Sequence, residues 1–365
     1  MQLIVGSYTE EMPFVRGQAD GVLTAAFDAA SGRIGPVSTA AVARNPSYLV
    51  RSADGERLFT VNETRAFAGQ PGGGVTAYAR DPRTGALTPL NSRPSLGDDP
   101  CFITLDPAQR FVLVANYGVE AGSVTVYQLE PDGRLGALTD HVEHAGSGPV
   151  PGRQENSHAH MIAADPVTGD LFVADLGSDT VRVYALDQDG RLVPKDGSLV
   201  RAAPGAGPRH LAFHPDGRHL FVVNELDSTV SALRRDGGRF AVAGRASTLP
   251  AAGSDRPGNP PGPGNAAAAL RVTPSGRHVL VSNRGHDSIA VLRFAPGTAE
   301  LSPVGHAASA GATPRDFVVT PDGRYVIVAG QDNDTLASYA FDDEAGTVRL
   351  VHTVAAPTPV CLALA

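Results

Sequence analysis

The chain has 365 residues, 42% of them hydrophobic and 19% charged, which is enough apolar material for a sizeable core and too little charge for a disordered protein. Its formal net charge of −8 argues against a nucleic-acid-binding protein, because such proteins normally present a basic face. No signal-peptide pattern and no run of 18 apolar residues is seen. We therefore expect a cytoplasmic protein that binds no membrane, with Cys101 and Cys361 as buried free thiols.

The first predicted strands lie near the N-terminus. They are "LIVGSYT" (3–9), "GVLTAAFD" (21–28) and the weaker "IGPVSTA" (34–40). Short runs rich in β-branched and aromatic residues, separated by Gly, Pro and Asp, are typical of β-strands. These three runs match the second, third and fourth strands of a unit that repeats further along the chain, but no first strand precedes them.

Six copies of that unit follow. Each copy has an apolar run, a turn rich in Pro, Asp and Gly, a second run that mostly ends near Asn, and then a third and a weaker fourth run. The opening halves of the copies lie at 45–63, 99–117, 157–176, 207–225, 267–284 and 313–331. Their spacing of roughly 45 to 60 residues is in or just above the range of four-stranded propeller blades.

The last run of the chain, "TPVCLALA" (358–365), has the pattern of a first strand with no second strand after it. Pairing it with the N-terminal run completes a seventh blade and hides the sheet edges that an open array would expose. The sequence therefore predicts an all-β protein, a seven-bladed β-propeller with four-stranded antiparallel blades. We expect residues 1–365 to form a single domain.

Loop lengths indicate which face of the propeller carries the site. In an up-and-down blade, the start of strand one lies beside the end of strand two on one face, and the short turn between them lies on the other. The long connections 9–20, 65–73, 146–157 and 251–265 all fall on the first face. Long loops on a rigid scaffold commonly carry function, so we expect the site on this face, overhung by the Pro/Gly-rich 251–265 segment.

Three neighbouring blades bring polar residues to this opening. Blade three supplies His158 and His160, blade four supplies Arg209 and Glu225, and blade five supplies Arg284. A purely structural role is the alternative for each: a loop cap for the glutamate, ion pairs with loop carboxylates for the arginines, and strand-end hydrogen bonds for the histidines. The histidines have no acidic or thiolate partner nearby in sequence, so we predict no metal site and no cofactor.

Three further residues extend this prediction. Arg153 and Arg315 are expected to add positive charge and to contact the substrate from the edge of the site. Glu63 repeats the position of Glu225 three blades away and is expected to take no part in catalysis.

Several phrases are similar to the lactonase family of seven-bladed propellers: "GPRHLAFHPDGRHLFVVNELDSTV", "SNRGHDSIAVL", "RQENSHAH" and "TPRDFVVTPDGRY". That family includes propeller-type 6-phosphogluconolactonases and, more distantly, carboxymuconate cyclases. The resemblance implies an active-site set on the His-x-His motif, the Arg after Gly-Pro, the Glu of Asn-Glu-Leu and the Arg of Asn-Arg-Gly. Those positions are His158, His160, Arg209, Glu225 and Arg284. Ser157 departs from the proline that the family usually has there.

The resemblance and the residues together indicate hydrolysis of a small anionic sugar lactone, 6-phosphogluconolactone first, by a monomer or weak homodimer. Arg209 and Arg284 would hold the anion, and Glu225 would orient or deprotonate water. His158 or His160 would protonate the leaving ring oxygen, although the reverse assignment of acid and base stays open. The alternatives are a lactone-forming cycloisomerase and a non-enzymatic propeller that binds another protein.

Overall fold

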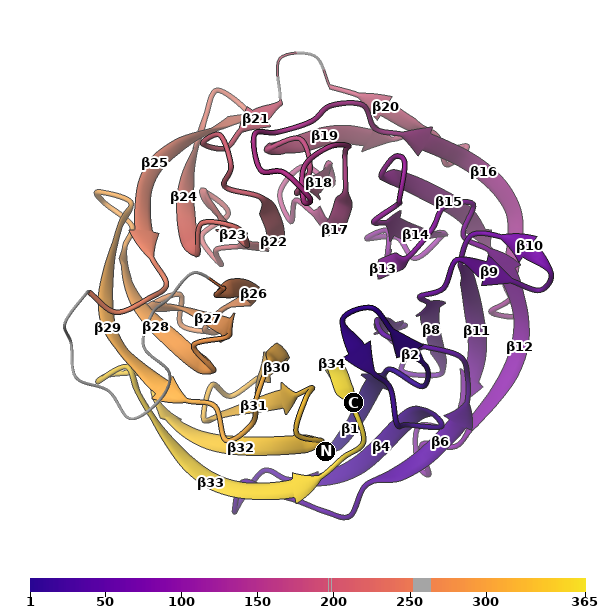
Figure 1. The fold of residues 1–365 in the computed structure, drawn as a ribbon, viewed down its shortest axis with the longest axis horizontal. Helices are drawn as coiled ribbons and strands as arrows, with labels where there is room; N and C mark the ends of the chain where they lie inside the picture. Colours follow the sequence, from indigo (N-terminus) through magenta and orange to yellow (C-terminus); the bar gives the residue numbers. More distant parts are fainter. Residues whose placement is uncertain (196, 198, 252–263) are drawn as a thin grey trace.

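The computed structural model describes residues 1–195, 197, 199–251 and 264–365. Seven sheets of four or five strands surround a central axis in this part of the chain, as Figure 1 shows. The predicted seven-bladed all-β propeller is therefore confirmed. No stretch of the described chain forms a helix of the length and apolarity needed to span a bilayer.

Blades one to three each begin at the central axis and end at the rim. Blade one contains β7 (Leu49–Arg51), β8 (Arg57–Asn62), β11 (Gly74–Arg80) and β12 (Leu87–Pro94). Blade two contains β13 (Pro100–Leu105), β14 (Phe111–Asn116), β15 (Ser123–Leu129) and β16 (Leu135–Glu143). Blade three contains β17 (Ala159–Ala164), β18 (Leu171–Asp175), β19 (Thr180–Leu186), β20 (Leu192–Pro194) and β21 (Val200–Arg201).

Blades four to six repeat this order without added strands. Blade four contains β22 (Pro208–Phe213), β23 (His219–Asn224), β24 (Thr229–Asp236) and β25 (Arg239–Ser247). Blade five contains β26 (Ala266–Val272), β27 (His278–Arg284), β28 (Ser288–Ala295) and β29 (Glu300–Ala308). Blade six contains β30 (Pro314–Val319), β31 (Tyr325–Gly330), β32 (Thr335–Asp342) and β33 (Thr347–Ala355).

Blade seven is built from both ends of the chain, as predicted. Its strands are β34 (Pro359–Leu364), β1 (Gln2–Ser7), β4 (Gly21–Asp28), β5 (Arg33–Ile34) and β6 (Ser38–Val42). The C-terminal β34 pairs antiparallel with β1, with Leu3 opposite Leu364 and Val5 opposite Leu362. The termini meet beside this pair, where the Gln2 amide donates to the Ala365 carbonyl at 2.8 Å.

The burial of each strand follows its place in the blade. The second strand is covered by neighbouring blades on both faces, so all six residues of β14 and of β23 are buried. Such strands read in the sequence as continuous apolar runs. The outermost strands, such as β12 and β16, keep many exposed side chains. The core therefore lies between blades, where Phe221 and Val223 of blade four pack with Val279 and Val281 of blade five.

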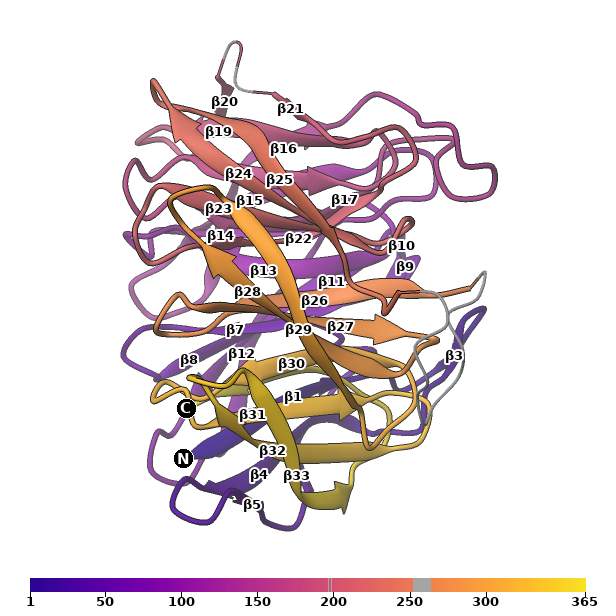
Figure 2. The same cartoon turned by 90° about the vertical axis from the view of Figure 1, so that its left-hand side faces the viewer.

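The strand register confirms the topology from which the site was predicted. Pro208, at the start of β22, lies opposite Asn224, at the end of β23, so Arg209 and Glu225 are neighbours on one face. Two small hairpins project from that same face in Figure 2: β2 (Glu11–Met12) with β3 (Val15–Arg16), and β9 (Ala66–Phe67) with β10 (Gln70–Pro71). The termini lie on the opposite face.

Candidate active site

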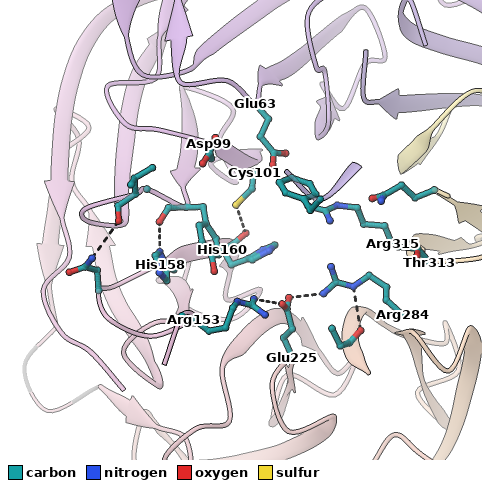
Figure 3. Close-up of a pocket in the computed structure, with 18 of the residues that line it drawn as sticks. Glu63, Asp99, Cys101, Arg153, His158, His160, Glu225, Arg284, Thr313 and Arg315 are labelled. Atoms are coloured by element: carbon teal, nitrogen blue, oxygen red, sulfur yellow. Dashed lines mark hydrogen bonds and ion pairs between the residues drawn. The ribbon is translucent and has the colours of Figure 1, made fainter. Parts of the chain in front are cut away.

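A cavity of about 740 Å³ opens at the mouth of the central channel, within the 300–1,000 Å³ range of small-molecule sites. Its walls come from the starts of first strands, the ends of second strands and the long loops of one face. Figure 3 shows the side chains that converge there. Of the predicted site residues, this cavity is lined by Arg153, His158, His160, Glu225, Arg284 and Arg315.

Glu225 is the most heavily paired carboxylate in the wall. Its Oε1 accepts from Arg153 at 2.5 Å, and its Oε2 lies 2.9 Å from Arg209 Nε and 2.7 Å from Arg284 Nη2. Burial alone would raise the pKa of Glu225, but Arg284, Arg209 and Arg153 outweigh it and hold that pKa well below the usual range. Glu225 is therefore ionised at neutral pH and cannot donate a proton there.

Arg209 lies behind Glu225 and is not part of the cavity wall. Its side chain is only 3% exposed, and its Nη1 donates to the Ala268 carbonyl at 2.8 Å. Arg209 thus contacts the carboxylate of Glu225 from the protein side, whereas Arg153 and Arg284 reach the same carboxylate from the cavity side. Direct contact between Arg209 and a substrate was a prediction from sequence, and this geometry does not favour it.

His158 sits on the wall formed by blades two and three. Its ring stacks on Tyr117, with the ring centroids 4.1 Å apart and the planes 8° from parallel. His158 Nδ1 lies 3.0 Å from the Tyr117 carbonyl oxygen, which can only accept, so Nδ1 carries the hydrogen. In the neutral ring Nε2 therefore holds the lone pair. The His158 amide donates to Asp175 at 2.8 Å, which fixes the backbone at this point.

His160 lies deeper in the channel and is buried. Burial, together with the positive charge of Arg209, lowers the pKa of His160 well below its ordinary value, so the ring is neutral at pH 7. It contacts Tyr117 edge to face and lies 5.6 Å, centroid to centroid, from His210. The two histidines of the His-x-His motif thus reach the same cavity at different depths.

Glu63 lines the same cavity, although the sequence analysis expected it to play no part. Figure 3 places its carboxyl across the cavity from Glu225. Both oxygens of Glu63 accept from the Tyr8 hydroxyl at 2.9 Å, and Ser47 donates to Oε2. The sequence signal that could have predicted this is the Asn-Glu pair, which ends the second strand in blade one as it does in blade four. In a closed ring, equivalent positions of the blades face the same channel.

Arg315 borders the cavity beside Glu63. Its guanidinium lies over the rings of Tyr8 and Phe14, at 5.4 and 5.5 Å from their centroids. Phe14 is at the tip of the β2–β3 hairpin and is half exposed. Among the arginines that line the cavity, Arg65, Arg153 and Arg284 each have a carboxylate partner, and Arg315 has none within ion-pair distance in the described part of the chain.

Two further features are the 251–265 segment and a cluster of three residues on the opposite face. The 251–265 segment was predicted to overhang the mouth; residues 252–263 lie outside the described residues, and Gly264 beyond them lines the cavity. On the opposite face, His214, Asp216 and His219 bring three potential metal ligands together. The Asp216 amide donates to His214 Nδ1 at 3.1 Å, so the lone pair of that nitrogen is already engaged in a turn hydrogen bond.

Comparison with known proteins agrees with this architecture. The model of a protein family described as lactonase, seven-bladed β-propeller, matches residues 2–364. The chain belongs to this lactonase family. A 6-phosphogluconolactonase of Bacillus subtilis is 34% identical over 98% of this chain and 96% of its own length. A 6-phosphogluconolactonase of Formosa agariphila is 28% identical, covering 86% of this chain and 85% of its own.

The fold of this lactonase is also similar to that of a solved structure. The periplasmic gluconolactonase of Pseudomonas aeruginosa superposes with a TM-score of 0.89 at 34% identity, covering 99% of this chain and 98% of that one. The predicted membership of the lactonase family and the prediction of a lactone-hydrolysing enzyme are thereby confirmed. The assignment of individual residues to catalysis remains a prediction.

Proposed function

We propose that this lactonase hydrolyses a sugar lactone, 6-phosphogluconolactone in preference to others, to the open-chain acid by side-chain acid–base catalysis with arginines binding the anion. The observation that carries the proposal is the arrangement around Glu225: a carboxylate held by three arginines lines the same cavity of about 740 Å³ as His158 and His160. One relative is named a 6-phosphogluconolactonase and another a gluconolactonase, and both names specify a gluconolactone as the substrate.

Water activation falls to Glu225 and His158. A carboxylate offers about four lone-pair sites, and three of those on Glu225 are engaged by guanidinium groups, which leaves one acceptor on Oε1 to orient a water molecule. His158 Nε2 is the lone-pair nitrogen and takes the water proton as the oxygen attacks the lactone carbonyl. Arg284, on the cavity side, stabilises the oxyanion that forms.

The anion of the substrate is assigned to Arg315. A guanidinium whose N–H groups have no carboxylate partner binds phosphate or carboxylate without first breaking an existing ion pair. Arg315 meets this condition among the cavity arginines of the described chain, and Tyr8 and Phe14 hold it in place. The leaving ring oxygen still requires a proton, for which the histidines were the donors predicted from sequence.

The test is a direct assay. Purified protein is mixed with freshly made 6-phosphogluconolactone, and separately with unphosphorylated gluconolactone, and acid release is followed with the spontaneous rate subtracted. We expect both lactones to be hydrolysed, the phosphorylated one with the higher kcat/KM. The proposal fails if neither lactone is hydrolysed faster than in buffer.

Glu225→Gln tests the centre of the site. Glutamine keeps the shape of glutamate but removes the charge that pairs with three arginines, so we expect kcat to fall by about 10²-fold or more. The matched control is Glu56→Gln, at an exposed position of the blade-one turn on the opposite face. Melting curves of both variants separate a loss of turnover from a loss of folded protein. Equal activity in the two variants would remove Glu225 from the mechanism.

A further inference from the structure

Two glutamates at equivalent positions of blades one and four face each other across the cavity, and their hydrogen-bond partners differ in kind. Every close side-chain partner of Glu225 is a guanidinium, which only donates and always carries charge. The partners of Glu63 are the hydroxyls of Tyr8 and Ser47. A hydroxyl either donates or accepts, so the site of Glu63 accommodates a carboxylate as well as a carboxylic acid, and the site of Glu225 accommodates only the carboxylate.

The surroundings of Glu63 also favour its protonated form. Burial raises its pKa, and the positive charge of Arg315 offsets only part of this effect. No described arginine lies within ion-pair distance of its carboxylate, whereas three do so for Glu225. Among the described residues, the titratable and charged groups around Glu63 come from blades one, two, three, four, six and seven: Tyr8, Tyr48, Asp99, Cys101, His160, Arg209, His210, Arg315 and Asp316.

The geometry points to Glu63 as a catalytic acid of the site, the group that protonates the leaving ring oxygen of the lactone. This inference rests on the proposed lactone hydrolysis and replaces the histidines as the source of that proton. Glu63 lines the cavity on the side away from Glu225, with His160 and Arg315 between the two carboxyls in Figure 3. A lactone bound between them has its carbonyl near Glu225 and its ring oxygen near Glu63.

The chemical step balances with water as the only added reactant. The water oxygen bonds to the carbonyl carbon while its proton passes to His158 Nε2. The bond between the carbonyl carbon and the ring oxygen then breaks, and Glu63 gives its proton to that oxygen, which becomes a hydroxyl. His158 returns its proton to solvent and Glu63 takes one up, so each turnover adds one water across the ester bond. The acid, Glu63, and the base, His158, are thus different groups in different environments.

The first test is the pH dependence of kcat for 6-phosphogluconolactone. An acid must be protonated to work, so wild-type kcat falls as pH rises through the pKa of Glu63. In Glu63→Gln we expect that alkaline fall to vanish and kcat to drop by about 10²-fold or more. Glu56→Gln is the control and keeps the wild-type profile. An alkaline fall that persists unchanged in Glu63→Gln overturns the inference.

A second variant decides the matter if Glu63→Gln does not fold. Tyr8→Phe removes a hydroxyl that donates to the carboxylate and therefore stabilises its ionised form. The pKa of Glu63 then rises further, and the alkaline fall of kcat moves to higher pH. A merely structural role for Glu63 predicts no such movement. An alkaline fall that stays in place in Tyr8→Phe overturns the inference.

An infrared titration separates this inference from the proposed function. The carboxylic-acid C=O band of Glu63 is obtained as the difference between wild type and Glu63→Gln, and we expect it to persist well above pH 4.3, the ordinary glutamate value. If the wild-type chain hydrolyses no lactone, the proposed function fails whatever the titration shows. If lactone is hydrolysed but the band is lost by about pH 4.3, Glu63 is ionised at working pH and the inference alone fails.

Discussion

The pKa of a side chain in this site depends more on its surroundings than on its residue type. Glu63 and Glu225 each follow an asparagine at the end of the second strand of their blade. The carboxyl of Glu63 is nevertheless paired with hydroxyls, and that of Glu225 with arginines. Because burial raises the pKa of Glu63, the free energy of unfolding decreases as pH rises from the ordinary glutamate pKa to the raised one, and above the raised pKa this cost to stability is complete. Glutamine at position 63 avoids that cost, so Glu63→Gln should melt at the wild-type temperature or higher near neutral pH.

Arg315 is the residue on which charge selectivity should depend. Replacing it by methionine removes the unpaired guanidinium but keeps much of the stem that packs on Tyr8 and Phe14. A charge-assisted contact is worth about 1.5–3 kcal/mol, so KM for 6-phosphogluconolactone should rise by about 10- to 100-fold. KM for unphosphorylated gluconolactone should change little.

The control for this prediction is Arg324→Met in the same blade. Arg324 lies in the turn between β30 and β31, on the opposite face, where it pairs with Asp322 at 2.6 Å. Steady-state kinetics on both lactones provide the comparison. An equal rise in KM for the two substrates would mean that Arg315 acts by holding Tyr8 and Phe14 rather than by binding the anion.

At the scale of elements, the site depends on close packing between strand ends and the loops beside them. Gly177 follows β18 and lies against the loop that leads into β17. A methyl group added there would meet the Asn156 carbonyl oxygen at 1.8 Å and His158 Cδ2 at 2.9 Å. Either the loop or the His158 ring would have to move, and displacements of about 1 Å in a catalytic group cost roughly 10²-fold in rate.

Gly177→Ala should therefore lose activity out of proportion to its loss of stability. We expect kcat to fall by about 10²-fold and the protein to remain folded at the assay temperature. Gly297→Ala is the matched control, since an added methyl group there has no neighbour within 4 Å. Activity and melting curves of the two variants are the measurement; full activity in Gly177→Ala would show that the loop yields without moving His158.

At the scale of the whole molecule, the ring is held closed by one strand. β34 supplies the innermost strand of blade seven and buries Val360, Cys361 and Leu362. Burying side chains of this size contributes about 1.5–3 kcal/mol each, which together is a large fraction of the 5–15 kcal/mol that stabilises a typical protein. Removing β34 also exposes the edge of β1, with which it pairs.

Deleting residues 358–365 should consequently destabilise all seven blades together. We expect the melting temperature to fall by about 10 °C or more and soluble yield to drop, because the opened edges invite association. Calorimetry or circular dichroism on the truncated and full chains is the measurement. A truncated chain with an unchanged melting temperature would mean that closure of the ring contributes little to its stability.

Most of the architecture was predictable because it depends on sequence patterns within short segments of the chain. The repeat of apolar runs and Pro/Asp/Gly turns sets the strands and the blade count, and the unmatched runs at the two ends set the closure. The face of the site followed from the fixed relation between strand-one starts and strand-two ends. That His158, His160, Glu225 and Arg284 line one cavity could be predicted for the same reason, since each lies at such a position; their roles in catalysis stay a prediction.

What only the tertiary structure decided are the contacts made across the channel. Sequence distance says nothing about them, because the ring brings every blade to a common axis. Arg153 reaches Glu225 from a loop 72 residues away, and Arg209 turns out to lie behind that carboxylate. Glu63 belongs to the same cavity as Glu225 and differs from it in its partners, which come from distant strands. The sequence repeat therefore determined the position of each glutamate at the end of a second strand. Packing between the blades determined which groups pair with it, because those groups come from other parts of the chain.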